Sequence, residues 1–207
     1  MFKMIGDITF SDLIILVGSI LVALTVHEFM HAYVGHLLGD TTAFDEGRVS
    51  FNPMRHIDPL TTVILPIVTI VLFGVPILAA KPVPFNPNRV KYDDFGSALI
   101  SAAGPLSNLV MAFLAALLTN AFAAGSMIEH VLAVFVGLNV AIFVFNLIPI
   151  PPLDGSRVLY AFAPDSIRRL FDQIEPMGLF IVFGLVLLGG FGGILTNLNN
   201  FVLNLLP

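Results

Sequence analysis

The sequence contains no cysteine, and only 11% of its 207 residues are charged. Without cysteine neither a disulfide nor a thiolate metal site can form, so any metal must be bound by His, Asp or Glu. No run of basic residues is present, which argues against a nucleic-acid partner. A soluble domain needs roughly a quarter of its residues charged to cover its surface. The shortage of charge, with 57% hydrophobic residues and a mean hydropathy of +0.96, therefore indicates a protein whose solvent is lipid.

Apolar stretches long enough to cross a bilayer alternate with short polar loops. A bilayer core about 30 Å thick needs about 20 helical residues. The stretches Ser11 to Leu38, Ser97 to Ala124 and Val131 to Ile148 come close to that length or exceed it. Met177 to Leu206 is apolar and glycine-rich, and we interpret it as a C-terminal span with room for a returning half-span. The pattern predicts an all-α polytopic membrane protein, a bundle of about 4–6 transmembrane helices.

The segment near 59–80 is apolar but interrupted by prolines and a glycine, and polar loops predicted to be extended flank it at 40–58 and 81–95. If this segment crosses the membrane fully, Arg48 and Arg55 lie opposite the other basic residues. If it dips in and returns, every basic residue except Lys3 lies on one side. The positive-inside bias therefore favours a re-entrant or broken segment. The helix before residue 38 and the helix ending near 148 would then run parallel, with their carboxyl ends toward the cytoplasm.

No polar linker is long enough to separate two folding units, so residues 1–207 are predicted to form a single membrane-embedded domain. Its core covers about residues 11–160, and the C-terminal transmembrane segment covers about 177–206.

The sharpest pattern is His27-Glu28-Phe29-Met30-His31. Residues four apart lie on one face of a helix, so His27 and His31 can both bind one metal ion. Beside them Glu28 can take a proton from water whose pKa zinc lowers to roughly 7. The alternative is a chance pattern, or histidines hydrogen-bonded within a helix bundle. An ionised acid near the centre of a spanning helix costs about 2.5–3.5 kcal/mol, so three polar groups there favour the metal.

A catalytic zinc needs a third protein ligand and one open position. His36 is rotated away from His27 and His31 around the helix. The remaining candidates are acidic or histidine side chains: His56, Asp58, His130 and Asp154. Asp154 follows an apolar span and prolines that must open the helix, but Asp before Gly155 is also typical of a side chain that merely caps the next helix. Spacing alone leaves these two interpretations open.

Two distant motifs carry a resemblance, namely the His27 to His31 motif and the stretch Asn146-Leu-Ile-Pro-Ile-Pro-Pro-Leu-Asp154-Gly155. Together they resemble the paired motifs of the site-2 protease family of intramembrane zinc metalloproteases. Shorter stretches resemble its short prokaryotic branch: Asn52 to Pro59, Lys81-Pro82-Val83-Pro84 and Gly104-Pro105-Leu106-Ser107-Asn108. The resemblance spans roughly residues 20–160, and no inserted stretch would form the PDZ or CBS module of some members.

The resemblance implies a zinc metalloendopeptidase with one Zn2+ bound by His27, His31 and Asp154, and Glu28 as the catalytic base. It implies an integral protein of a prokaryotic cell membrane, with the active site nearer the cytoplasmic side. The expected partners are the lipid bilayer and transmembrane or membrane-associated protein substrates, with no nucleic acid; the oligomeric state stays open.

Two asparagines and a further histidine are weaker candidates. Asn146 can position substrate or donate to the developing oxyanion, a contribution on the order of 3 kcal/mol, or it can bond a neighbouring helix. Asn108 has the same two interpretations, with helix packing favoured, and His56 is a candidate donor to the substrate or to a group around the site. The loop at Lys81 to Pro84 is kept extended by its prolines and is a candidate to pair with an unwound substrate.

Two other function classes compete with a protease. A metal transporter would line polar ligands along a path through several helices, whereas the polar groups here converge on one place. A proteolytically inactive scaffold would not need the complete set of His27, Glu28, His31 and Asp154.

Overall fold

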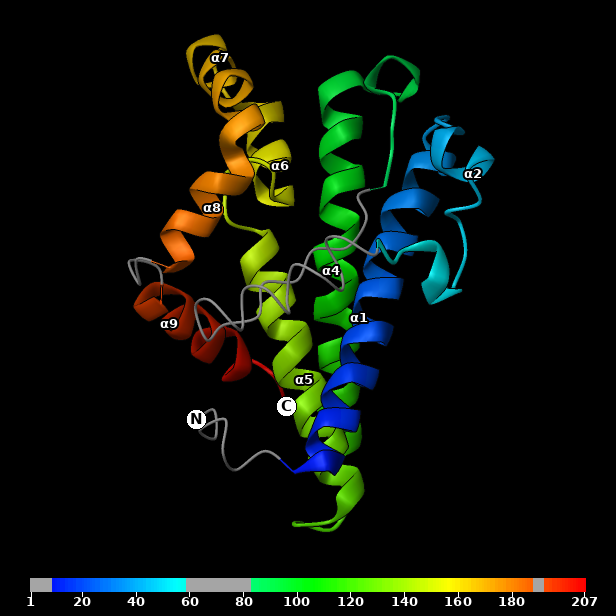
Figure 1. Ribbon diagram of the computed structural model, residues 1–207, viewed down its shortest axis with the longest axis vertical. Helices are drawn as coiled ribbons and strands as arrows, with labels where there is room; N and C mark the ends of the chain where they lie inside the picture. The colour runs from blue at the N-terminus through cyan, green and yellow to red at the C-terminus, as the bar shows by residue number, and fades with distance from the viewer. Residues whose placement is uncertain (1–8, 59–82, 188–191) are drawn as a thin grey trace.

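The computed structural model describes residues 9–58, 83–187 and 192–207 (Figure 1). These residues form helices and loops and contain no strand, which confirms the all-α prediction. The α-helices are α1 (Phe10–Leu37), α2 (Thr42–Asp45), α4 (Asp93–Thr119), α5 (Met127–Asn146), α6 (Asp154–Phe162), α7 (Asp165–Ile174), α8 (Gly178–Leu187) and α9 (Gly192–Leu203). Short 3-10 turns occur at η2 (Pro53–Arg55), η4 (Pro87–Arg89) and η5 (Glu175–Met177).

Three of the described helices are long and apolar enough to cross a membrane: α1 with 28 residues, α4 with 27 and α5 with 20. Each begins before the stretch that the pattern predicted, α4 at Asp93 and α5 at Met127. In the predicted C-terminal segment, α8 has 10 residues and α9 has 12. The predicted re-entrant segment near 59–80 lies outside the described residues.

The surface of α1 is apolar and its interior face is polar. Large exposed side chains along it include Phe10, Ile14 and Val22, whereas the buried residues are small or polar. The buried set is Ser19, Ala23, Thr25, His27, Glu28, His31, Ala32 and Gly35. A helix of a soluble protein shows the opposite distribution, because its apolar side faces the core. This inversion is expected where lipid surrounds the bundle and polar side chains face inward.

Helix α4 is the centre of the bundle and packs against α1, α5 and α6. Helices α1 and α5 run in the same direction and α4 runs opposite to both, as predicted (Figure 1). An ion pair of 2.8 Å between His130 and Asp12 joins the starts of α1 and α5. The parallel arrangement brings the end of α5 and the start of α6 to the level of the histidine motif on α1.

The loops at 40–58 and 83–92 are less extended than predicted, because they contain α2, η2 and η4, and α4 already begins at Asp93. The buried Asp40 holds the two loops together: its Oδ2 accepts a bond of 2.6 Å from the Asn86 amide, and its Oδ1 accepts from the Thr42 amide at 3.0 Å. Burial alone would raise the pKa of Asp40. The hydrogen bonds from Thr42 and Asn86 outweigh that effect, and the pKa lies below its ordinary value of 3.8.

Candidate metal centre

His27 and His31 project from the same face of α1 into the bundle, and both are buried. At 1.5 Å per residue they lie about 9–15 Å along the axis from the end of α1 at Leu37. Their rings meet edge to face with centroids 4.6 Å apart, and the two Nε2 atoms are 3.0 Å apart. The i, i+4 spacing therefore places two imidazole nitrogens at one point, where both could bind a single metal ion.

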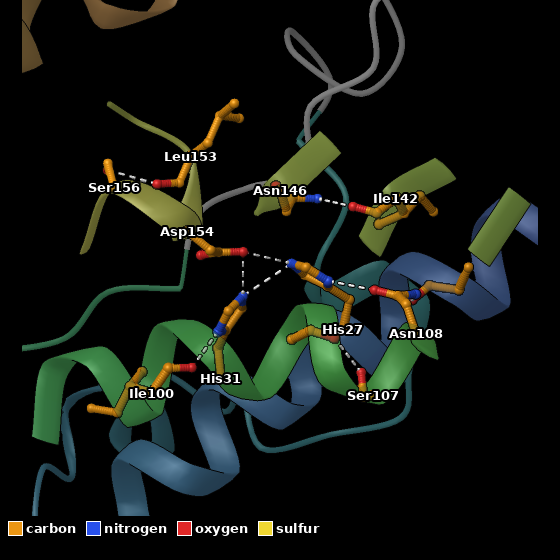
Figure 2. A network of polar contacts seen from close by, with 12 residues as sticks. His27, His31, Ile100, Ser107, Asn108, Ile142, Asn146, Leu153, Asp154 and Ser156 are labelled. Carbon is orange, nitrogen blue, oxygen red and sulfur yellow. Dashed lines mark hydrogen bonds and ion pairs between the residues drawn. The ribbon is translucent and has the colours of Figure 1, made fainter. Parts of the chain in front are cut away.

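Asp154 is the first residue of α6 and reaches the same point (Figure 2). Its Oδ2 lies 3.3 Å from His27 Nε2 and 3.4 Å from His31 Nε2. The N-cap of α6 is Leu153, and no side chain caps this helix. The interpretation of Asp154 as a simple cap therefore does not describe its position. Among the described residues, His27, His31 and Asp154 form the group of three side chains arranged to hold a metal ion.

Backbone packing fixes the start of α6. A Cβ added at Gly155 would lie 2.2 Å from the carbonyl oxygen of Leu147. Because real Cβ atoms essentially never come within 3.0 Å of another heavy atom, only glycine permits this approach. The glycine after Asp154 thus lets the turn from α5 fold back tightly enough to aim the carboxylate at α1.

The hydrogen bonds of the two rings determine which nitrogen carries the proton. His31 Nδ1 lies 2.7 Å from the backbone oxygen of Ile100, which can only accept, so Nδ1 donates. His27 Nδ1 lies 2.6 Å from Asn108 Oδ1, also an acceptor. In both neutral rings Nε2 is then left with its lone pair, and the two lone pairs face each other. A single positive charge that both nitrogens contact, whether a metal ion or a proton on one ring, removes the repulsion between these lone pairs.

The spacing of the three ligand atoms suits zinc. A tetrahedral zinc site with bonds of 2.0–2.1 Å has ligand atoms about 3.3 Å apart. The observed separations of 3.0, 3.3 and 3.4 Å fall around that value. If these three side chains bind zinc, they would leave one position of a tetrahedral site for water or substrate, as a catalytic site requires.

Space for the two rings comes from α4. A Cβ at Gly104 would lie 2.3 Å from His31 Nε2 and 2.8 Å from His27 Cε1. Gly104 therefore does more than let α4 pack closely against another helix. Because it has no side chain, it leaves the space that the His27 and His31 rings occupy.

Comparisons with known proteins identify the family. The family model described as Peptidase family M50 matches residues 119–189. YwhC of Bacillus subtilis is 36% identical over 81% of this chain and 77% of its own length. Rip2 of Mycolicibacterium smegmatis is 30% identical over 84% of this chain and 67% of its own, and MJ0611 of Methanocaldococcus jannaschii is 29% identical over 72% of each. Each of the three is named "Putative zinc metalloprotease". The chain belongs to peptidase family M50.

No solved structure gives a significant match to the chain. Membership of M50, the site-2 protease family, confirms the resemblance drawn from the two motifs. The protein is a zinc metalloprotease embedded in a membrane, which sets aside the transporter and the inactive scaffold.

In this M50 protease, Glu28 is buried beside the two histidines. Its carboxylate is close enough to interact electrostatically with His27, His31, Asp154 and His56. The helix therefore delivers the predicted base to the predicted metal site, one residue along from the first ligand.

The two weaker candidates occupy different positions. Asn146 is the last residue of α5, and its Nδ2 donates to the Ile142 oxygen of its own helix at 3.0 Å (Figure 2). His56 is buried after η2, and its Nε2 lies 2.8 Å from the Ser50 oxygen, so Nε2 donates. His56 Nδ1 is buried and has no partner among the described residues.

The other candidate ligands lie elsewhere. His36 stacks on Phe44 with ring centroids 4.7 Å apart, and His130 pairs with Asp12. Neither these two histidines nor Asp58 belongs to the metal-binding group of the described chain. The rotation argument for His36 is thus consistent with the structure.

The sequence interpretation missed Asn139, which is fully buried on α5 and bonded to Asn108. A lone amide in an apolar span was the available signal, because a polar side chain at that depth is costly. The Ile100 carbonyl that orients His31 has no signal in the sequence at all.

Proposed function

We propose that this M50 protease hydrolyses peptide bonds of transmembrane or membrane-associated proteins, within or beside the bilayer. In this proposal His27, His31 and Asp154 hold one zinc ion and Glu28 is the general base. The observation that carries it is the convergence of the three ligand atoms to within 3.4 Å inside a bundle whose outer surface is apolar.

Bound zinc supplies Lewis acidity, which makes a water molecule nucleophilic at neutral pH. Glu28 takes a proton from that water on a carboxylate oxygen and passes it to the departing amine nitrogen. The hydrogen bonds from His27 to Asn108 and from His31 to Ile100 keep both rings in one orientation throughout. Proton transfer by a positioned group of this kind contributes typically about 100- to 10,000-fold to the rate.

Asn146 is proposed to stabilise the oxyanion or to position substrate. Its amide nitrogen carries two N–H groups, and the bond to Ile142 uses one of them. The second N–H is the donor assigned to the substrate oxygen. Its place at the end of α5, eight residues before Asp154, supports this role.

His56 is proposed to contact the substrate as a hydrogen-bond acceptor, whereas the sequence suggested that it would be a donor. Because Nε2–H already donates to Ser50, the remaining Nδ1 accepts a hydrogen bond. A substrate backbone N–H near Glu28 is the donor that we assign to it.

The basic residues support an active site nearer the cytoplasmic side. The described lysines and arginines all follow the end of α1, precede α4 or lie on α6 and α7: Arg48, Arg55, Arg89, Lys91, Arg157, Arg168 and Arg169. Helices α2, α6 and α7 and the start of α4 lie at one end of the bundle (Figure 1). By the positive-inside bias that end faces the cytoplasm, and the histidines lie closer to it than to the start of α1.

The loop at Lys81 to Pro84 is proposed to present backbone groups to an unwound substrate; its first two residues lie outside the described residues, and Val83 and Pro84 lead into Phe85 and Asn86. The Asn86 amide is bound by Asp40, and the Arg157 guanidinium lies 5.0 Å from the centre of the Phe85 ring. These two contacts hold the loop in one geometry, as strand-like pairing with a substrate requires.

The test is cleavage of a synthetic transmembrane substrate in detergent by wild type, Glu28→Gln and a His27→Ala/His31→Ala double variant, each with its zinc content measured. Glu28→Gln is expected to bind zinc and lose at least about 100-fold in cleavage rate. The double variant is expected to lose both zinc and activity. Equal cleavage by wild type and Glu28→Gln would overturn the assignment of the base, and undiminished zinc in the double variant would overturn the assignment of the ligands.

A further inference from the structure

Two asparagines lie at the centre of the bundle with no exposed surface, Asn108 on α4 and Asn139 on α5. Asn108 Nδ2 donates to Asn139 Oδ1 at 2.8 Å and to the Ala23 oxygen at 3.3 Å. Asn139 Nδ2 donates to the Phe135 oxygen at 2.9 Å. Buried amides are costly in an apolar bundle, and those that occur there usually serve a function.

The direction of this chain of bonds is dictated by backbone oxygens, which can only accept. Asn139 must turn its nitrogen toward the Phe135 oxygen, so its Oδ1 faces Asn108. Asn108 must then turn its nitrogen toward Asn139 and Ala23, so its Oδ1 faces His27 Nδ1. Reversing either amide would bring oxygen against oxygen. His27 therefore has to donate from Nδ1 and keep the lone pair on Nε2.

The two metal-site histidines are held by different means. His31 donates to the backbone oxygen of Ile100, which cannot rotate out of its helix. His27 donates to a side-chain amide, which can turn over by half a rotation about its last bond. A reversed Asn108 would offer N–H groups to His27 Nδ1 and move the ring proton to Nε2, where it blocks a metal. The bonds from Asn108 Nδ2 to Asn139 Oδ1 and to the Ala23 oxygen oppose that reversal, and the bond to Asn139 is the shorter of the two.

We propose that Asn108 and Asn139 are positioning residues that hold His27 in the tautomer protonated on Nδ1 and so reserve its Nε2 for the metal. The proposal rests on the proposed function, which makes His27 a ligand. Groups that orient metal-bound histidines in this way typically account for 10- to 100-fold in metal affinity.

Zinc affinity of the full chain in detergent, measured by competition with a chromophoric chelator, tests the proposal. Asn108→Leu is expected to weaken zinc binding about 10- to 100-fold. Asn139→Leu removes one hydrogen bond from Asn108 and is expected to weaken it about 2- to 12-fold. Because Asn139 acts only through Asn108, the double variant should bind no more weakly than Asn108→Leu alone. Losses that multiply in the double variant would overturn the relay.

Two further measurements distinguish the loss of these hydrogen bonds from a general loss of packing. Val140→Ala shortens a fully buried side chain in the apolar cluster between α4 and α5 and leaves the hydrogen-bonding groups of Asn139 in place, so it should lower thermal stability while leaving zinc affinity within about 2-fold. Nitrogen NMR of metal-free protein with labelled histidine reports the tautomer directly, with the His27 signal identified by its absence from His27→Gln. Wild type should be protonated on Nδ1, and Asn108→Leu should gain protonation on Nε2.

Failure of this inference differs from failure of the proposed function. Wild-type zinc affinity and an unchanged tautomer in Asn108→Leu and Asn139→Leu, with zinc lost in His27→Ala, would overturn the positioning role and keep the ligand assignment. Unchanged zinc affinity in His27→Ala would overturn both.

Discussion

Gly104→Ala adds one methyl group at the most crowded point of the metal centre. The new Cβ would lie 2.3 Å from His31 Nε2, so the nitrogen would have to recede by about 1 Å to reach an ordinary contact of 3.4 Å. His31 cannot rotate away freely, because its Nδ1 is bound to the Ile100 oxygen, and His27, 2.8 Å from the same Cβ, is held by Asn108.

A displacement of this size is large on the scale of a metal site. Metal–ligand distances are maintained within about 0.2 Å, so a shift of about 1 Å removes a ligand rather than stretching a bond. We expect Gly104→Ala to weaken zinc binding by at least about 100-fold, the upper end of what the loss of an outer hydrogen bond causes. Cleavage of the synthetic substrate should fall by at least as much at limiting zinc.

The assay is zinc competition in detergent, with thermal unfolding of the metal-free protein measured alongside. Gly18→Ala is the matched control, since it lies on the ligand-bearing helix and its Cβ would meet nothing within 4 Å. Gly35→Ala is a second control, with its nearest contact 3.8 Å away at Ile100. Both should bind zinc like wild type. Wild-type zinc affinity in Gly104→Ala would refute the argument that this glycine makes room for the ligands.

Three further predictions concern Asp40, Gly155 and the zinc ion. Asp40→Asn should lower the free energy of unfolding by about 1.5–3 kcal/mol at pH 7, because one charge-assisted hydrogen bond to Asn86 is lost. Since the pKa of Asp40 is lowered by folding, this advantage of wild type should be present above the ordinary pKa of 3.8 and disappear as the pH falls below it, as chemical denaturation across pH would measure. Gly155→Ala should weaken zinc binding roughly 5- to 150-fold in the competition assay, because the Leu147 carbonyl 2.2 Å from the new Cβ belongs to the backbone and forces the start of α6 away. Removing zinc with a chelator should lower the unfolding temperature and restoring it should reverse the change; free zinc at 100 times its Kd corresponds to about 2.7 kcal/mol, and an unchanged transition would contradict a bound ion.

The spanning helices were predictable because lipid imposes a simple rule of length and polarity. α1, α4 and α5 were found within a few residues of their ends, since about 20 apolar residues are needed to cross. The bounds of α4 were the least accurate, four residues off at the start and five at the end. The hydropathy pattern placed the start of α4 at Ser97, because it does not count charged residues as part of a span. The helix begins at Asp93, since acidic residues are favourable in the first turn of a helix.

The grouping of the proposed metal ligands was predictable as far as it is local or carried by a motif. Helical spacing alone places His27, Glu28 and His31 together. Asp154 needed the resemblance, because a carboxylate before Gly155 has two interpretations until the end of α5 is placed beside α1. The roles of Asn139 and of the Ile100 carbonyl could not be predicted. They depend on which face of α4 and of α5 points into the bundle, and the sequence of an apolar helix does not show this.

Between the histidine motif on α1 and the Asp154 motif after α5, the chain contains α4, which runs antiparallel to α1 and α5 and packs against both. A parallel pair such as α1 and α5 requires a return segment, and here the return segment also completes the site. From α4 come the oxygen that orients His31, the amide that orients His27 and the glycine that admits both rings. These same bonds direct the Nε2 atoms of both rings to one point beside the Asp154 carboxylate. The helix that lies between the two motifs in the chain therefore also fixes the directions in which the proposed ligand nitrogens point.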